Sequence, residues 1–206
     1  SPKSPSVGGG GCQAGDGGWG GALIVIEADS VDVAGTVNVS GSNNGTFYGG
    51  GGAGGGVRLV CRTLSGTPTG LISANGGNGN GTSGGGGGGR IALLYETALP
   101  WPGLRFSCSP GTGRGIASSP HPFQPDQGTL YLADTAALAN SLDDNRFRDV
   151  TLFVGDLPGW SAATLDIGNC AFRFGATGFV VSVTGDLRVD GGRFGAETIL
   201  CGGDLM

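Results

Sequence analysis

The sequence predicts an all-β protein built as a parallel β-helix (β-solenoid), with stacked polyglycine-II-like Gly-rich segments in its N-terminal half. Three observations support this prediction. Glycine accounts for 47 of the 206 residues, apolar and polar residues alternate over short runs, and these runs recur at regular spacing. Alternation with a period of two is typical of strands with one buried face, and a fixed spacing is typical of repeat architectures.

The first half of the chain contains a repeat of 35 residues. Residues 20–45 align with residues 55–79, which places Ile24 on Leu59 at this spacing. A third copy begins with GRIALLYETAL at residues 89–99. Each copy consists of an alternating strand, a short turn, a second strand and a Gly-rich tract. We therefore expect the equivalent strands of successive copies to lie beside one another.

Gly-rich tracts of similar length precede the three copies, at residues 8–21, 42–56 and 76–89. Glycine chains can adopt the extended threefold helix of the polyproline II type, and the lack of a Cβ lets such chains approach closely enough to exchange backbone hydrogen bonds. Because buried backbone groups need partners, we expect the tracts to pack together as ordered segments. The alternative is that they are three disordered loops.

The second half of the chain repeats at a shorter spacing. The tetrapeptide RFGA at residues 173–176 recurs at 193–196, a spacing of 20 residues. Short strands with Gly turns at such a spacing suit one rung of a parallel β-solenoid. One short helix is expected at residues 134–145, where Asp134 precedes an Ala- and Leu-rich run. The side chains expected to point inward and stack are Leu165, Ile167, Phe172, Phe174, Val181, Val183, Leu187 and Val189.

Composition divides the chain into four parts. Residues 1–7 form a Ser/Pro linker, residues 8–99 carry the Gly-rich repeats, residues 100–128 form a Pro-rich surface loop, and residues 129–206 form solenoid rungs. Solenoids need polar terminal caps to stay soluble, and the last rung has none. We therefore expect the rungs to continue beyond this sequence.

Charge and hydropathy exclude two classes of partner. The net charge is −5, and the eleven Lys and Arg are scattered rather than gathered in a basic stripe, so we expect no nucleic-acid binding. No apolar run approaches the roughly 18 residues that indicate a membrane span, so we expect no membrane insertion.

The five cysteines follow no metal-binding spacing. Cys61 and Cys201 lie in apolar strand runs, and we interpret them as small core residues. Cys12, Cys108 and Cys170 are the candidates for disulfides, and an odd count leaves at least one thiol without an internal partner.

Three Asn-X-Ser/Thr sequons make Asn38, Asn44 and Asn80 candidates for N-glycosylation. Chance would supply one or two such sequons in a chain of this composition. The third gives weak support for an extracellular glycoprotein.

Three tryptophans, Trp19, Trp101 and Trp160, are candidates for carbohydrate contacts, because an aromatic ring can form a platform for a sugar. The other interpretation, which we favour, is that large aromatic side chains among glycines fill gaps in a thin core.

The best candidate for a catalytic site is the run SLDDNRFRD, which contains Asp143, Asp144, Arg146, Arg148 and Asp149. Glycoside hydrolysis needs two carboxylates roughly 5–9.5 Å apart, and arginine can bind a uronate carboxylate. An Asp-Asp-Asn run is also an ordinary turn with solvated charges. We favour the turn and predict no catalytic residue.

Other residues that could carry chemistry lack the pattern it needs. His121 stands alone between prolines, with no nucleophile motif. The run GGGGGGR at residues 84–90 lacks the Gly-Lys-Ser/Thr ending and the helix of a phosphate-binding loop. We therefore predict no cofactor and no metal site. Two pairs of acids are interpreted as turn residues rather than calcium ligands: Asp29 with Asp32, and Asp186 with Asp190.

Three stretches, Gly70–Leu94, Gly128–Leu132 and Val181–Val189, resemble the Gly-rich parallel β-helix arrays of very large exported surface proteins of bacteria, protists and algae. The resemblance covers most of the chain, but its motifs are low in complexity. It implies adhesins, cell-wall components or extracellular filament subunits. The five cysteines depart from the bacterial arrays and favour a eukaryotic secreted setting.

We therefore expect a structural module of a large extracellular surface or filament protein, in which a stiff β-solenoid serves as a scaffold for assembly. Its partners would be other copies or other domains of the same assembly, with carbohydrate as a further candidate. The alternative is a carbohydrate-binding adhesin. A β-helix polysaccharide lyase or hydrolase is favoured less, and an ice-binding surface has no regular Thr array to support it.

Overall fold

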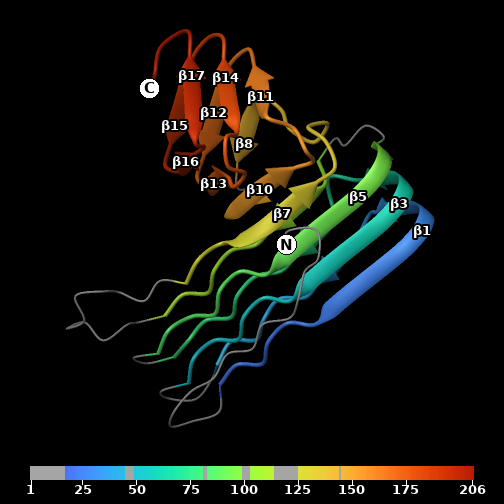
Figure 1. Cartoon of the computed structure of the whole chain (residues 1–206). Helices are drawn as coiled ribbons and strands as arrows, with labels where there is room; N and C mark the ends of the chain where they lie inside the picture. The colour runs from blue at the N-terminus through green and yellow to red at the C-terminus, as the bar shows by residue number, and fades with distance from the viewer. Residues whose placement is uncertain (1–16, 45–48, 81–82, 99–102, 114–124, 144) are drawn as a thin grey trace.

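The computed structural model describes residues 17–44, 49–80, 83–98, 103–113, 125–143 and 145–206, and these residues form strands and turns without a helix. Three long strands lie side by side at one end of the molecule (Figure 1). Gly-rich segments lead into them, and the short strands of the C-terminal half stack at the other end.

The largest sheet runs the whole length of the molecule and has seven parallel strands. Its long strands come from the N-terminal repeats, and its short strands come from the second half. In spatial order they are β1 (Leu23–Val33), β3 (Gly56–Gly66), β5 (Arg90–Ala98), β7 (Gly128–Leu132), β10 (Val150–Val154), β13 (Ala171–Phe174) and β16 (Arg193–Gly195).

Three smaller parallel sheets complete the fold. The first belongs mainly to the N-terminal repeats and contains β2 (Thr36–Asn38), β4 (Leu71–Ser73), β6 (Arg105–Ser107) and β9 (Phe147–Arg148). The second contains β11 (Gly159–Ala162), β14 (Val180–Val183) and β17 (Thr198–Cys201). The third contains β15 (Leu187–Asp190), β12 (Leu165–Gly168) and β8 (Ser141–Asp143).

The predicted parallel β-helix is wrong, because the strands form four separate parallel sheets of unequal size rather than one continuous solenoid. The physical reason is that the two halves use different repeats. An N-terminal repeat has one strand of 9–11 residues and one of 3 residues, whereas the second half turns after every 2–5 residues. The coarser prediction of an all-β protein agrees with the structure.

The register of the long strands also differs from the predicted spacing. Ile24 pairs with Val57, which is 33 residues away, whereas Val37 pairs with Ile72 at the predicted 35. The difference arises between the two strands, where the second copy has two more turn residues than the first. A shift of two residues keeps every side chain on its own face of the sheet, so the side chains predicted to point inward still do so.

The Gly-rich segments pack against one another, as the sequence predicted. The segments that precede the long strands bond to one another: Gly21 donates its N–H to the carbonyl oxygen of Ala53 at 2.8 Å, and Gly54 donates to that of Gly87 at 2.9 Å. They also bond to the segment that follows the short strand β4, where Gly77 donates to the carbonyl oxygen of Gly52 at 2.7 Å and Gly86 donates to that of Gly77 at 2.8 Å. The segments are therefore hydrogen-bonded in two directions.

Side chains would prevent this packing. A Cβ at Gly86 would lie 2.0 Å from the carbonyl oxygen of Gly52, closer than any real carbon–oxygen contact. By contrast, a Cβ at Gly84 would meet no atom of the described residues within 4 Å. Glycine is thus required at particular positions rather than throughout a segment.

The apolar core lies between the sheets and contains the side chains predicted to point inward, with Val189 half-buried at its edge. In the second half, phenylalanines from successive turns stack on one another. The ring centroids of Phe106 and Phe147 lie 5.7 Å apart, and those of Phe147 and Phe172 lie 5.5 Å apart. These separations are typical of favourable aromatic pairs.

Two local predictions differ from the structure. Residues 134–143 form turns and strand β8 instead of a helix. Asp134 explains the difference, because its Oδ1 accepts the N–H of Ala136 at 2.9 Å and the hydroxyl of Tyr95 at 2.7 Å, which holds a turn. The predicted Pro-rich surface loop contains strand β6, whose central Phe106 is buried in the core.

The cysteines do not form the predicted disulfides. Cys108 and Cys170 are reduced thiols buried in the core, because apolar strands from adjacent turns enclose them. Cys61 is buried as predicted, whereas Cys201 is exposed, because β17 is the edge strand of its sheet. Cys12 lies outside the described residues.

The glycine packing predicts a difference between two positions in one segment. We expect Gly86→Ala to lower the free energy of unfolding by about 1–3 kcal/mol, the usual cost of overpacking, because its Cβ meets the backbone of Gly52. Gly84→Ala should be neutral or stabilising by up to about 1 kcal/mol. Urea denaturation of both variants checks this, and equal destabilisation would contradict the close packing.

The cysteines predict selective labelling. Burial raises the pKa of the Cys61 and Cys108 thiols, and the thiolate is the reactive form. We expect a thiol-specific reagent to modify Cys201 rapidly in the folded protein and to modify Cys108 and Cys170 only after denaturation. Peptide mass spectrometry after timed labelling measures this. A disulfide-linked Cys108–Cys170 peptide from the non-reduced protein would refute the reduced thiols.

Candidate functional site

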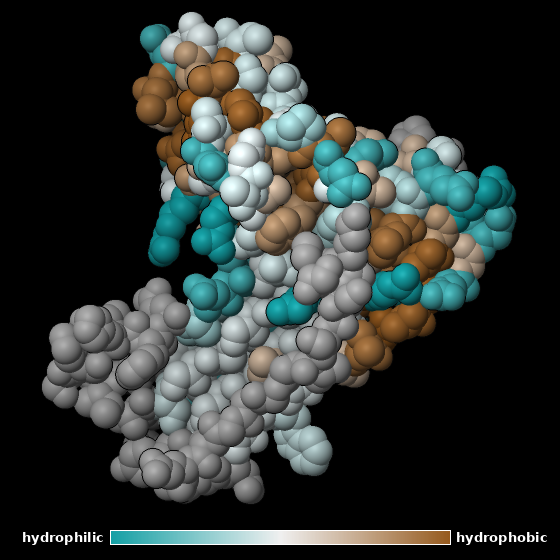
Figure 2. Space-filling view, in the orientation of Figure 1, coloured by the Kyte–Doolittle hydropathy of each residue, from teal (hydrophilic) through white to brown (hydrophobic). Residues whose placement is uncertain are grey.

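The candidate site is a groove on the outer face of the seven-stranded sheet, at the ends of β7, β10, β13 and β16. It consists of two adjoining cavities of about 440 and 560 Å³, which share Asp126, Gln127, Arg173 and Gly195. Figure 2 shows a hollow between the C-terminal part of the molecule and its Gly-rich part, with hydrophilic residues on the upper rim.

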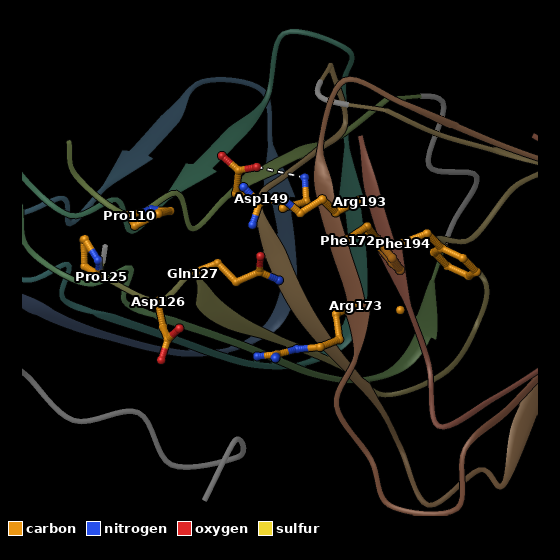
Figure 3. Close-up of a pocket in the computed structure, with 11 residues that line it drawn as sticks. Pro110, Pro125, Asp126, Gln127, Asp149, Phe172, Arg173, Arg193 and Phe194 are labelled. Atoms are coloured by element: carbon orange, nitrogen blue, oxygen red, sulfur yellow. Dashed lines mark hydrogen bonds between the residues drawn. The ribbon is translucent and has the colours of Figure 1, made fainter. Parts of the chain in front are cut away.

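The register of the seven-stranded sheet brings the polar side chains of the groove next to one another. Thr129, Thr151 and Arg173 are direct neighbours on β7, β10 and β13, and such neighbours in a sheet lie about 4.8 Å apart. The Thr151 hydroxyl accepts a hydrogen bond from Arg173 Nη2 at 3.1 Å and another from Gln127 Nε2 at 3.2 Å. The guanidinium and amide are therefore held on the floor of the groove (Figure 3).

Asp149 lies at one end of the groove, and its carboxylate accepts two hydrogen bonds that stabilise the fold. Its Oδ1 accepts the N–H of Ala171 at 2.9 Å, the dashed line in Figure 3, and its Oδ2 accepts the Ser109 hydroxyl at 2.8 Å. Asp149 has a φ of 49°, in the left-handed region. This conformation is unfavourable for most residues other than glycine, asparagine and aspartate, and the two hydrogen bonds stabilise it here. Asp149 thus connects two turns of the chain.

The groove is suited to binding. Arg173 and Arg193 supply hydrogen-bond donors, Asp126 supplies acceptors, and the Phe194 ring supplies an apolar surface. The described residues that line the groove include no His or Cys, and the Asp149 carboxylate is occupied by structural hydrogen bonds. Such a set of groups can hold a hydroxyl-rich ligand by hydrogen bonds and ring contacts.

The run weighed as a candidate catalytic cluster is divided between different cavities. Asp143 lines a cavity beside β12 and β15, whereas Asp149 lines the groove. Asp143 Oδ1 accepts the backbone N–H of Asn145 at 3.1 Å and that of Arg146 at 3.3 Å, which is the turn that the sequence favoured. Asp144 lies outside the described residues.

The remaining acids are also engaged at the surface. Asp29 forms an ion pair with Arg62 at 2.7 Å, and the hydrogen bond and charge of this guanidinium lower the pKa of Asp29. Asp190 pairs with Arg188 at 3.1 Å. No group of three or more His, Cys, Asp or Glu residues in the described part of the chain is placed to hold a metal ion. Two further acids accept hydrogen bonds: Asp32 from Ser65, and Asp186 from the Asp204 N–H.

The two described tryptophans among the candidates for carbohydrate contact lie in different parts of the fold. Trp19 is 83% exposed in the Gly-rich segment that precedes β1, the edge strand of the large sheet. Trp160 lies on β11, half-buried against the core, with its ring centroid 6.1 Å from that of Phe174. Trp160 thus fills space in the core. Trp101 lies outside the described residues, as does His121.

The predicted glycosylation sites differ in exposure. Asn38 is exposed on β2, and its Oδ1 accepts the backbone N–H of Ser40 at 3.0 Å. Asn44 and Asn80 are half-buried among the Gly-rich segments, and the Asn44 amide donates to the carbonyl oxygen of Gly50 at 3.5 Å. The threonines of these two sequons, Thr46 and Thr82, lie outside the described residues. Asn38 is the most accessible of the three.

Sequence reasoning missed the groove, although one signal for it was present. The repeated RFGA tetrapeptide aligns Arg173 with Arg193 at a spacing of 20 residues and indicates that their strands are neighbours. The structure does pair β13 with β16, but at a spacing of 22, so that Ala171 lies opposite Arg193 and Arg173 lies opposite Gly195. Gln127 and Asp126 come from the segment before β7, and nothing in the sequence indicates that this segment faces the two arginines.

The described residues contain no helix that is both long and apolar enough to cross a membrane. Comparison of the chain with protein families, with characterised proteins and with solved structures gives no significant match.

Proposed function

We propose that the protein is a structural module of a large extracellular surface or filament assembly. The observation that carries the proposal is the hydrogen bonding of the Gly-rich segments in two directions, together with a seven-stranded parallel sheet along the molecule. Each backbone bond contributes little by itself, but a network in two directions resists local opening. A rigid scaffold needs this property.

The distribution of exposed apolar side chains supports association through the ends of the sheets. Trp19, Leu23 and Val25 are exposed at the β1 edge of the large sheet, and Val25 is 51% exposed. Ile199 and Leu200 on the edge strand β17 are exposed as well, as are Leu205 and Met206 beyond it. Unpaired strand edges with apolar side chains favour addition of another strand. The partners would be other copies or other domains of the same assembly.

A carbohydrate-binding adhesin is the second candidate function, and the groove favours it. The donors and the ring that sugar binding needs are provided by Arg173, Arg193, Gln127 and Phe194. This candidate no longer depends on the tryptophans. The lyase or hydrolase has no support from Asp143, whose carboxylate caps a turn.

Association through the sheet edges predicts which substitutions prevent assembly. We expect Leu23→Lys or Leu200→Lys to raise the concentration needed for assembly about tenfold, since a buried leucine contributes about 1.5–3 kcal/mol and an edge lysine opposes strand pairing. Leu157→Lys is the control, because Leu157 is 42% exposed in a turn away from both edges.

Sedimentation and electron microscopy over a concentration series measure the assembly, and urea denaturation confirms that each variant is folded. A wild-type chain that stays monomeric at every concentration, with no ordered particles, contradicts association between copies. An equal effect of Leu157→Lys contradicts the assignment to the edges.

An extracellular location predicts N-glycosylation. We expect the protein from a eukaryotic secretory host to exceed its sequence mass by at least one glycan, and Asn38→Gln to remove one, because Asn38 is the most exposed of the three sequon asparagines. Intact mass before and after enzymatic removal of N-glycans measures this. A secreted protein with the mass of the bare sequence would refute the prediction.

A further inference from the structure

A second polar cavity lies on the outer face of the four-stranded sheet, away from the groove. It has a volume of about 230 Å³. Strand register builds it: Arg105 on β6 lies beside Leu71 on β4, and Ser107 lies between Ser73 and Arg148 of the neighbouring strands. We call it the basic pocket. Its polar lining is Ser73, Asn75, Arg105, Ser107, Asn145 and Arg148.

The basic pocket has two cations and no carboxylate in its described lining. Neither Arg105 nor Arg148 forms an ion pair with a described acid, whereas Arg58, Arg62 and Arg188 all do. Of the described acids, the two nearest in sequence to Arg148 are engaged elsewhere: Asp143 caps the Asn145 turn, and Asp149 bonds to Ser109 and Ala171. Two arginines therefore line one pocket with no acid among the described residues paired to either of them.

Arg105 has an unsatisfied donor. Its Nη2 donates to the carbonyl oxygen of Thr69 at 3.3 Å, but its Nε is buried and has no hydrogen-bond partner among the described residues. Leaving a buried N–H of a charged group unpaired is costly. An anion bound in the pocket would offset this cost, because a guanidinium presents paired donors that match a carboxylate or sulfate.

The neutral residues of the pocket add further donors. Asn75 Oδ1 accepts the Ser107 hydroxyl at 2.7 Å and the backbone N–H of Ser109 at 2.8 Å. These bonds fix the orientation of the amide and leave the Asn75 Nδ2 hydrogens as donors. Asn145 is exposed on the rim, where its Nδ2 donates one hydrogen bond to Asp143 Oδ2 at 3.5 Å and has a second hydrogen to donate. Neutral amides of this kind suit the hydroxyl groups of a sugar.

We propose that the basic pocket binds the carboxylate or sulfate group of an acidic polysaccharide. Arg105 and Arg148 would hold the anionic group, and Asn75 and Asn145 would hold the adjoining sugar hydroxyls. A polyphosphate ligand such as nucleic acid fits less well, because the chain carries a net charge of −5 and the described lining of the pocket has two cations. The site is independent of assembly through the sheet edges, so either proposal can fail without the other.

The test measures binding of the full chain to polygalacturonate by calorimetry. The same polymer with its carboxylates methyl-esterified is the matched neutral ligand, and a sulfated polysaccharide and a single-stranded oligonucleotide are the other two ligands. We expect binding to polygalacturonate or to the sulfated polymer, which identifies the source of the anion. We expect little binding to the methyl ester and weaker binding as salt is raised.

Variants separate the site from the general charge of the protein. Arg105→Gln and Arg148→Gln should each weaken binding about tenfold, the effect of losing one charge-assisted hydrogen bond. Arg188→Gln removes the same charge from β15 in another sheet and should leave binding unchanged. Without ligand, Arg105→Gln should be at least as stable to urea as the wild type, because it removes a buried unpaired N–H.

Three outcomes overturn the proposal. The first is no binding of either acidic polymer. The second is equal binding of polygalacturonate and its methyl ester, or tighter binding of the oligonucleotide. The third is an equal loss of binding in Arg188→Gln, which would show that only net charge matters. A marked loss of stability in Arg105→Gln would show that Arg105 is needed for folding. The proposal would then be tested by Arg148→Gln, which changes an exposed residue, and unchanged binding by that variant would overturn it.

Discussion

The close approach of glycine backbones is the constraint on which the rest of the structure depends. Glycine loses more conformational freedom on folding than any other residue, so folding a chain with 47 glycines carries a large cost in conformational entropy. The fold offsets this cost by contacts that only glycine allows. A Cβ at Gly77 would clash with the carbonyl oxygen of Ser42, and one at Gly86 with that of Gly52. The same residue type that predicts disorder by composition is required for order by packing.

The sequence predicted the local features better than their assembly. Alternation identified the strands and their inward faces, and similar tract lengths indicated that the Gly-rich segments are neighbours. The number of sheets could not be predicted, because it depends on where successive turns fall in space. Two additional turn residues before Leu71 change the register of the long strands from 35 to 33 while the short strands keep 35. The cysteine spacing likewise carried no information about burial, and the core enclosed Cys108 and Cys170 as reduced thiols.

The candidate sites were harder to predict, because each is made of residues that are far apart in the sequence. The groove joins Gln127 to Arg173, and the basic pocket joins Ser73 to Arg148. Short-range signals did work where the chemistry is local, as in the Asp143 turn. They could not show that Arg105 and Arg148 line the same pocket, because this placement depends on β6 forming inside a segment whose prolines indicated a loop.

Side-chain hydrogen bonds between repeats show how the rigid part of the molecule can position these surfaces. Asn43 Oδ1 accepts the backbone N–H of Asn78, and Asn78 Oδ1 accepts that of Thr112, both at 2.8 Å. Each repeat thus fixes the next one through a backbone N–H that the glycine network leaves available. Asn75, which lines the basic pocket, continues a similar series through Ser40 and Ser109. Because these groups are held by the scaffold before any ligand arrives, binding there would cost little ordering entropy. The stiffness that supports a structural role therefore also favours recognition on the faces of the sheets.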